Sequence, residues 1–113
     1  MTIEPIIKPA LEQLGYPVAP DCYSGDADEY IVFNYSDERP TNYVDDVDRY
    51  DLTTVQVHFF TCYDPSGIKP KIRAILRKLG FTILATEQFY ETDTKYRHVI
   101  VEAEIASEIK EEV

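Results

Sequence analysis

The chain has 113 residues, of which 44% are hydrophobic, and its formal net charge is −10. This length is typical of one domain with its own hydrophobic core, and the hydrophobic content argues against a chain that is disordered throughout. The sequence has no run of about 18 apolar residues, and its first residues lack the basic start of a signal peptide, so we expect neither a membrane span nor a secretion signal.

The negative charge is concentrated in the first part of the sequence. Residues 1–65 carry 13 acidic and 3 basic side chains, a net charge of −10, whereas residues 66–113 carry 8 of each and are neutral. Nucleic-acid phosphates and anionic lipids repel an acidic surface. We therefore expect no specific nucleic-acid binding and no membrane binding, and plain solubility is the alternative reason for the charge.

The first predicted element is a helix from Thr2 to Leu14. Its apolar residues recur at helical spacing and form one stripe, and Gly15 followed by Pro17 marks its end. Pro9 removes one internal hydrogen bond, which predicts a kink or a late start of the helix. The residues of the apolar stripe are Ile3, Ile6, Ile7, Ala10, Leu11 and Leu14.

Loops are predicted on both sides of the first strand. Residues 16–29 are rich in Pro, Gly and acidic side chains, which favours a loop. The aromatic and β-branched run Tyr30–Tyr35 is typical of a strand. Residues 37–50 are polar and acidic, and we interpret them as a long connection that carries a cluster of carboxylates. The carboxylates of this cluster are Asp45, Asp46 and Asp48.

The second part of the sequence predicts a strand, a helix and two further strands. A strand that begins at Asp51 or Leu52 and runs to Tyr63 precedes a helix that opens near Pro65 and ends at Gly80. Strands follow over residues 81–90 and 95–105, and residues 107–113 are expected to fray. Residues 1–113 thus form a single α+β domain: two layers in the order α-β-β-α-β-β, with an antiparallel four-stranded sheet and both helices on one face.

An uncovered sheet face follows from this arrangement, because both helices are expected on the same side. Phe60 and Ile100 alternate away from the apolar positions of their strands and are expected on that bare face. An exposed sheet face with large apolar side chains is typical of a surface for association. The predicted fold therefore favours an oligomer.

Candidate catalytic and metal-binding residues form no recognised motif. His58, Cys62 and His98 could ligate zinc only if their strands paired in one particular register. The acidic cluster lacks the glycine and the final glutamate of a calcium loop, and the paired carboxylates Glu102 and Glu104 have no evident pocket. We expect no enzyme activity, no cofactor and no metal ion. The two cysteines form no CxxC pair, which favours a reduced, cytosolic setting.

The basic face of the second predicted helix is a candidate contact surface. Lys69 and Lys71 lie near the helix N-terminus, where the helix dipole disfavours cations, and this placement points to an acidic partner surface. An ordinary solvated helix face is the alternative. Nine tyrosines are many for this length, and Tyr43 and Tyr50 suit the rim of a contact. The basic residues of this helix face are Lys69, Lys71, Arg73, Arg77 and Lys78.

Several segments resemble the small tail terminator (tail completion, minor tail) proteins of long-tailed bacteriophages and prophages. The resemblance covers roughly residues 3–105 and lies in the order of the elements rather than in a catalytic signature. The segments that carry it, after an N-terminal helix, are YIVFNYSDERP, DLTTVQVHFFT, PSGIKPKIRAILRKLGF and TKYRHVIVEAEI.

This resemblance implies a structural virion assembly protein that forms a homo-oligomeric, hexameric ring. Such a ring caps the tail tube and joins the tail to the head connector, so its partners are the tail tube protein and the head–tail connector protein. DNA passes through the ring without specific binding. The implied location is the virion tail, and the cytoplasm of the bacterial host during assembly.

The resemblance also implies roles for two groups of residues. Asp45, Asp46 and Asp48 face the channel or the tube in this interpretation. Lys69, Lys71, Arg73 and Arg77, together with Tyr43 and Tyr50, contact the adjacent subunit. Two alternatives stay open: another phage neck or head-completion protein, and an acidic mimic of DNA that inhibits a DNA-binding protein.

Overall fold

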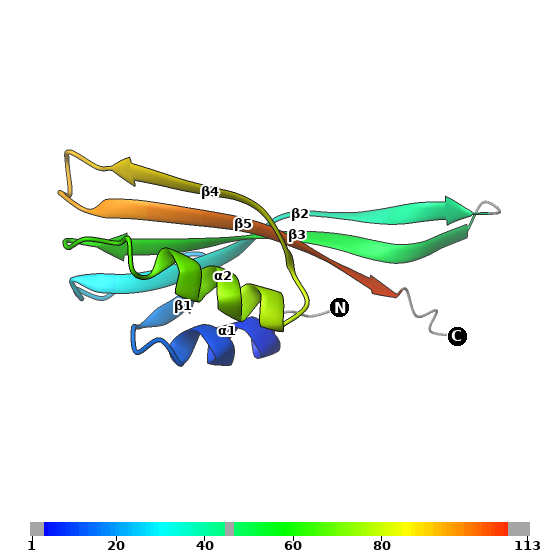
Figure 1. The fold of residues 1–113 in the computed structure, drawn as a ribbon, viewed down its shortest axis with the longest axis horizontal. Coiled ribbons are helices and arrows are strands. Elements are labelled where there is room, and N and C mark those ends of the chain that lie inside the picture. Colours follow the sequence, from blue (N-terminus) through cyan, green and yellow to red (C-terminus); the bar gives the residue numbers. More distant parts are fainter. Residues whose placement is uncertain (1–3, 45–46, 109–113) are drawn as a thin grey trace.

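The computed structural model describes residues 4–44 and 47–108, and for residues 4, 36–51, 107 and 108 it describes the backbone alone. In the described residues a helix is followed by three strands, a second helix and two further strands, so most of the fold is sheet (Figure 1). The elements are α1 (Glu4–Glu12), β1 (Val18–Pro20), β2 (Glu29–Val44), β3 (Val47–Thr61), α2 (Lys69–Lys78), β4 (Thr82–Tyr90) and β5 (Arg97–Glu108).

The five strands form one mixed sheet in the order β1-β2-β3-β5-β4, so the predicted antiparallel four-stranded sheet in the order α-β-β-α-β-β is wrong. The additional strand is β1, which pairs in parallel with β2, whereas all other neighbours are antiparallel. Only three residues form β1, and they lie in the segment predicted as a loop. Proline is tolerated at the end of an edge strand because its missing N–H is not needed there, so Pro20 does not exclude this strand.

The long loop predicted over residues 37–50 is also wrong, because β2 and β3 continue as a hairpin as far as the pair Val44 and Val47. A register shift between Tyr35 and Asp37 marks a bulge in β2. Pro40 fits this strand because β1 pairs with β2 only at Ile31–Phe33, which leaves the outer side of β2 unpaired beyond that point in the described chain. We call residues 37–44 and 47–54 the projecting arm, since Figure 1 shows them extending past both helices.

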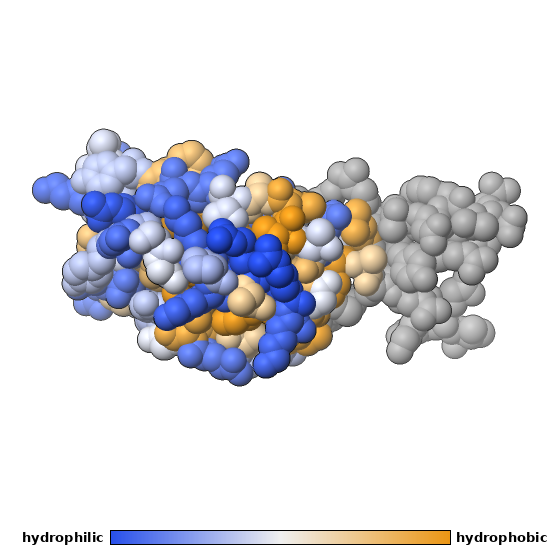
Figure 2. Space-filling view, in the orientation of Figure 1, coloured by the Kyte–Doolittle hydropathy of each residue, from blue (hydrophilic) through white to orange (hydrophobic). Residues whose placement is uncertain are grey.

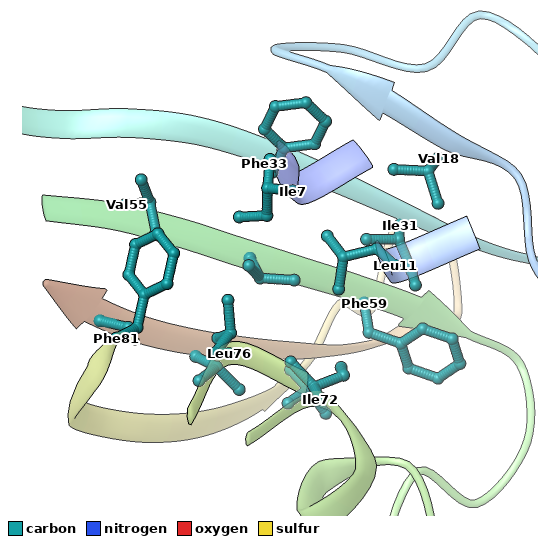
Figure 3. Packing of buried hydrophobic residues seen from close by; sticks show 14 of the residues in the cluster. Ile7, Leu11, Val18, Ile31, Phe33, Val55, Phe59, Ile72, Leu76 and Phe81 are labelled. Atoms are coloured by element: carbon teal, nitrogen blue, oxygen red, sulfur yellow. The ribbon is translucent and has the colours of Figure 1, made fainter. Parts of the chain in front are cut away.

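The helices cover one face of the sheet, and the core lies between these two layers (Figure 3). Alternate residues of β2, β3 and β5 point to the helices, and Ile7 and Leu11 of α1 and Ile72 and Leu76 of α2 meet them, all at 0% exposure. The helix α1 contains Pro9 and is nonetheless one element from Glu4 to Glu12. The sheet residues of the core are Ile31, Phe33, Val55, Val57, Phe59, Val99, Val101 and Ala103.

Gly80 ends α2 as the sequence predicts. Its φ of 102° lies in the left-handed region that glycine adopts without strain. The Gly80 N–H donates to the Arg77 carbonyl at 3.0 Å, and the Phe81 N–H donates to the Leu76 carbonyl at 2.9 Å. These two bonds satisfy carbonyls at the helix end and turn the chain into β4.

Candidate functional site on the uncovered sheet face

The sheet face opposite the helices carries a row of aromatic side chains. Strand register aligns Tyr30 of β2, Phe60 of β3, His98 of β5 and Phe89 of β4 across the sheet. Ring centroids lie 4.7 Å apart between Tyr30 and Phe60 and 4.1 Å apart between Phe60 and His98, in stacked geometry. Tyr23, from the loop after β1, stacks on Tyr30 at 4.4 Å. Each such aromatic pair contributes about 0.5–1.5 kcal/mol beyond its buried area, so the row ties four strands together.

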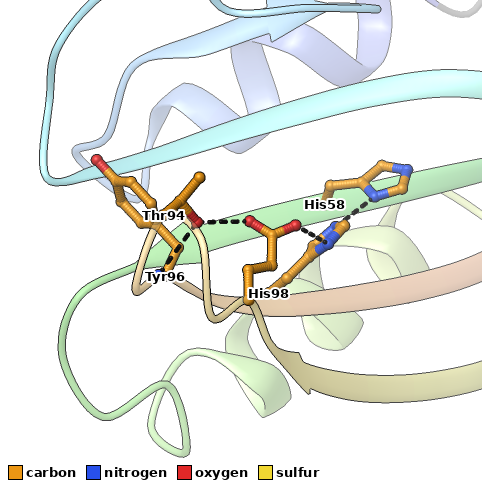
Figure 4. A network of polar contacts seen from close by, with 5 residues as sticks. His58, Thr94, Tyr96 and His98 are labelled. Carbon is orange, nitrogen blue, oxygen red and sulfur yellow. Dashed lines mark hydrogen bonds and ion pairs between the residues drawn. The ribbon is translucent and has the colours of Figure 1, made fainter.

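A chain of polar contacts runs beside this row and links three strands to the turn between β4 and β5. Figure 4 shows its part from His58 through His98 to Thr94 and Tyr96. Nδ1 of His58 lies 2.7 Å from Nε2 of His98, and Nε2 of His58 lies 3.1 Å from Oδ1 of Asn34. On the other side, Nδ1 of His98 lies 3.5 Å from Oε2 of Glu91. Thr94 donates to Oε1 of Glu91 at 2.9 Å, which holds this carboxylate in the turn.

The carboxylate end sets the direction of the hydrogen bonds in this chain. A carboxylate only accepts, so Nδ1 of His98 carries the hydrogen that faces Glu91. In a neutral His98 the other nitrogen, Nε2, then accepts from Nδ1–H of His58. Nε2 of His58 is left as an acceptor, which requires the NH2 group of Asn34 to face it. A 180° rotation of the Asn34 side-chain amide exchanges its oxygen and nitrogen, and after this rotation every group in the chain has a hydrogen-bond partner.

Burial keeps both imidazoles neutral at neutral pH. Burial, and to a lesser extent the neighbouring His98, lowers the pKa of His58 to about 4. Burial also lowers the pKa of His98, although Glu91 opposes that shift. A histidine with a strongly lowered pKa is a weak base near pH 7. The arrangement therefore suits a structural link between strands rather than proton transfer.

Two hollows mark the uncovered face. The larger has a volume of about 460 Å³, and its lining includes Tyr23, Val32, Asn34, His58 and Phe60. This lining combines aromatic and apolar side chains with amide and imidazole groups and the carboxylate of Asp21, a mixture that is typical of a contact surface for another molecule.

The smaller hollow, of about 80 Å³, lies between β3, β5 and β4. It is lined by Gln56, Ala85, Glu87, Ile100 and Glu102. Nε2 of Gln56 donates to Oε2 of Glu102 at 3.2 Å and so orients that carboxylate. The hollow thus combines an apolar lining with two acidic side chains.

The basic residues predicted as contacts lie on α2, on the other side of the molecule, where Figure 2 shows a hydrophilic band. Lys71 and Arg77 are exposed, whereas Lys69 and Arg73 are half-buried. The Arg73 guanidinium donates to Oγ1 of Thr86 at 3.3 Å, so this residue already binds its own chain. Lys71 and Arg77 therefore remain the better candidates for contact with a partner.

The other predicted contact residues lie in the projecting arm. Strand register pairs Tyr43 with Asp48 and Thr41 with Tyr50, so the two tyrosines are diagonal neighbours in the ladder. Asp48 belongs to β3 and not to a loop. Asp45 and Asp46 lie outside the described residues. The structure thus brings Tyr43, Asp48 and Tyr50 together and places them away from α2.

The possible zinc ligands are only partly brought together. His58 and His98 contact each other through their ring nitrogens, which occupies the atoms that would bind a metal. Among the described residues, no group of three or more His, Cys, Asp or Glu side chains is arranged to hold a metal ion. Cys22 and Cys62 are exposed free thiols.

Sequence reasoning missed the aromatic row and the roles of Asn34 and Glu91. The alternation of apolar and polar residues placed Phe60 on the bare face, but only the pairing of β3 with β5 sets His98 beside it.

A scan against models of known protein families finds no match, and a comparison with curated protein sequences finds no similar protein. Neither helix in the described part of the chain is long and apolar enough to cross a membrane.

Proposed function

We propose that the chain is a structural subunit of a homo-oligomeric ring, a tail completion protein that caps the tail tube of a phage-like particle and joins it to the head connector. The observation that carries this proposal is the projecting arm. With this arm the molecule measures 51 × 25 × 23 Å and is elongated, whereas a compact domain has similar extents in all three directions. Beyond Tyr50, where the described pairing of β3 with β5 ends, the arm is a two-stranded ribbon. Such a ribbon is marginally stable alone, and contact with a neighbouring subunit stabilises it.

The charge of the arm supports the same proposal. Residues 37–51 contain six acidic and two basic side chains. An acidic segment that faces the channel of a ring repels the phosphates of DNA, so DNA slides through without adhering. In this arrangement Asp45, Asp46 and Asp48 face the channel or the tube, and Tyr43 and Tyr50 contact the adjacent subunit.

The uncovered sheet face supports assembly over catalysis. Phe89, which lies on this face through its pairing with His98, is 49% exposed, although large aromatic side chains are favoured inside proteins and interfaces. No described residue of this face combines a nucleophile with an active base, because the two histidines bind each other and are neutral. A surface of this composition is suited to binding protein.

If the chain forms a hexameric ring, the mass of the particle is about six times the 13.0 kDa of one chain. Native mass spectrometry and light scattering on the purified chain, at rising concentration and with tail tubes added, measure this mass, and negative-stain microscopy shows whether the particle is annular. A monomer under all of these conditions contradicts the proposal. A monomer that instead competes with DNA for a DNA-binding protein favours the mimic of DNA.

Removing the arm separates folding from assembly. Replacing residues 39–52 by Asn-Gly closes the hairpin directly at the pair Glu38 and Thr53 with a favoured two-residue turn. Since the core lies between the helices and the other half of the sheet, we expect the free energy of unfolding of the trimmed chain to change by less than about 1 kcal/mol.

The trimmed chain is nonetheless expected to stay monomeric at concentrations where the full chain forms the ring. Urea unfolding followed by circular dichroism checks the first expectation, and native mass spectrometry checks the second. A trimmed chain that still forms the ring shows that the arm is not an assembly element.

A further inference from the structure

We propose that the uncovered sheet face of one copy receives the basic outer face of α2 from the next copy. This inference rests on the proposed ring and identifies the two surfaces that meet in it. In the described part of the chain the two surfaces carry charges of opposite sign: carboxylates lie on the uncovered sheet face and cations on the outer face of α2.

The sheet face is negative. Glu87 of β4 and Glu102 and Glu104 of β5 share the face opposite the helices by strand alternation and register. No lysine or arginine among the residues with described side chains lies on this face of β2, β3, β4 or β5. A cationic surface is therefore attracted to the β4 and β5 side of this face.

The small hollow between β4 and β5 is suited by its lining to bind a basic side chain. In its lining Ala85 pairs with Glu102 and Ile100 pairs with Glu87, so each apolar side chain lies beside a glutamate. A lysine or arginine buries its methylene stem against apolar groups while its charged end meets carboxylates. Each such pair at a desolvated interface contributes orientation as well as attraction.

The outer face of α2 is complementary. Lys71, Arg77 and Lys78 are exposed, and no carboxylate of the described residues forms an ion pair with them. Between these cations lie Pro70 and Ala74, which are exposed as well. Small apolar side chains at the centre of the helix face allow a close approach to a sheet, and the cations flank the contact.

The two surfaces cannot meet within one chain. The helix α2 packs against the core side of β4 and β5, through Ile72 and Leu76, whereas Glu87 and Glu102 lie on the opposite side of the same strands. Contact between them is therefore a contact between copies. A contact between two unlike surfaces repeats from copy to copy and closes into a ring when the rotation permits.

Charge reversal on each surface tests the inference. The sheet variant carries Glu87→Lys and Glu102→Lys, and the helix variant carries Lys71→Glu and Arg77→Glu. The two helix reversals act oppositely on the helix dipole, so their effects on the stability of α2 offset each other. A control, Glu12→Lys with Asp26→Lys, matches the charge change of the sheet variant at two exposed residues outside both surfaces.

Sedimentation velocity and native mass spectrometry at low salt provide the measurement, with circular dichroism to verify folding. We expect each reversed variant alone to associate about tenfold or more weakly than the wild type. An equimolar mixture of the two is expected to recover association, because every contact then joins opposite charges. The control is expected to associate like the wild type.

The outcomes separate this inference from the proposed function. If the wild type forms the ring and both reversed variants form it equally well, the inference is overturned and the ring stands on another contact. A mixture that fails to recover association also overturns it. If the wild type is monomeric throughout, both proposals are overturned.

Discussion

Replacing Phe59 by alanine lowers the free energy of unfolding by about 3–5 kcal/mol, the range found when a buried aromatic side chain is truncated. Phe59 is 1% exposed and lies in the middle strand of the sheet. Its ring meets Tyr16 in edge-to-face geometry, with centroids 5.0 Å apart. The substitution leaves a cavity between the sheet and the helices, which close packing on both sides prevents from collapsing.

Phe89→Ala is the matched control, because it removes the same side chain from the same sheet at 49% exposure. It loses only part of the contact with His98 and leaves no enclosed cavity, so we expect a loss below about 1 kcal/mol. Urea unfolding of the monomeric protein at neutral pH measures both values. Equal losses for the two substitutions would show that the core does not lie where the helices cover the sheet.

Acid is expected to destabilise the fold through His58. The pKa of this side chain is 6.5 when unfolded and about 4 in the fold, because burial disfavours the charged form. Below pH 6.5 the unfolded state therefore binds a proton that the folded state does not bind. The contribution is fully present above pH 6.5 and is lost as the pH falls toward 4. Because the imidazole is only partly buried, screening by solvent reduces the loss to on the order of 1–2 kcal/mol.

His58→Asn removes this titration and serves as the reference. The free energies of unfolding of the wild type and the variant, measured by urea denaturation across this pH range, isolate the contribution of His58 because the carboxylates titrate in both. We expect the advantage of the wild type to shrink steadily as the pH falls. An advantage that stays constant from pH 6.5 to 4 would contradict a buried neutral imidazole.

The helices and the core could be predicted from sequence because their signals are local. Ile72 and Leu76 lie four residues apart on α2, and this spacing predicts the helix. Gly80 predicts where the helix ends. The arm could not be predicted in this way. Its residues are predominantly polar, so the sequence there shows no alternation of apolar and polar side chains. Polar residues 37–50 therefore suggested a loop.

Only part of the candidate site could be predicted from the sequence, for a related reason. Alternation along β3 places Phe60 on the face away from the helices, and the charge of α2 is evident from its five basic residues. The neighbours of Phe60 depend on the register between β3 and β5. No short-range signal fixes that register, because His58 and His98 are 40 residues apart. The acidic hollow at Glu87 and Glu102 depends on the pairing of β4 with β5 and on the bulge in β4.

The central place of β3 also affects how the protein is made. Its neighbour β2 precedes it directly, but its second neighbour β5 is synthesised only after α2 and β4. On the ribosome, Val55, Val57 and Phe59 are thus present before the strand that completes their sheet. An unpaired apolar strand edge invites pairing with other chains, so the nascent chain is most prone to aggregate during this interval. Slow translation after β3 would lengthen this exposure, and a chaperone that holds the hairpin until β5 emerges would shorten it.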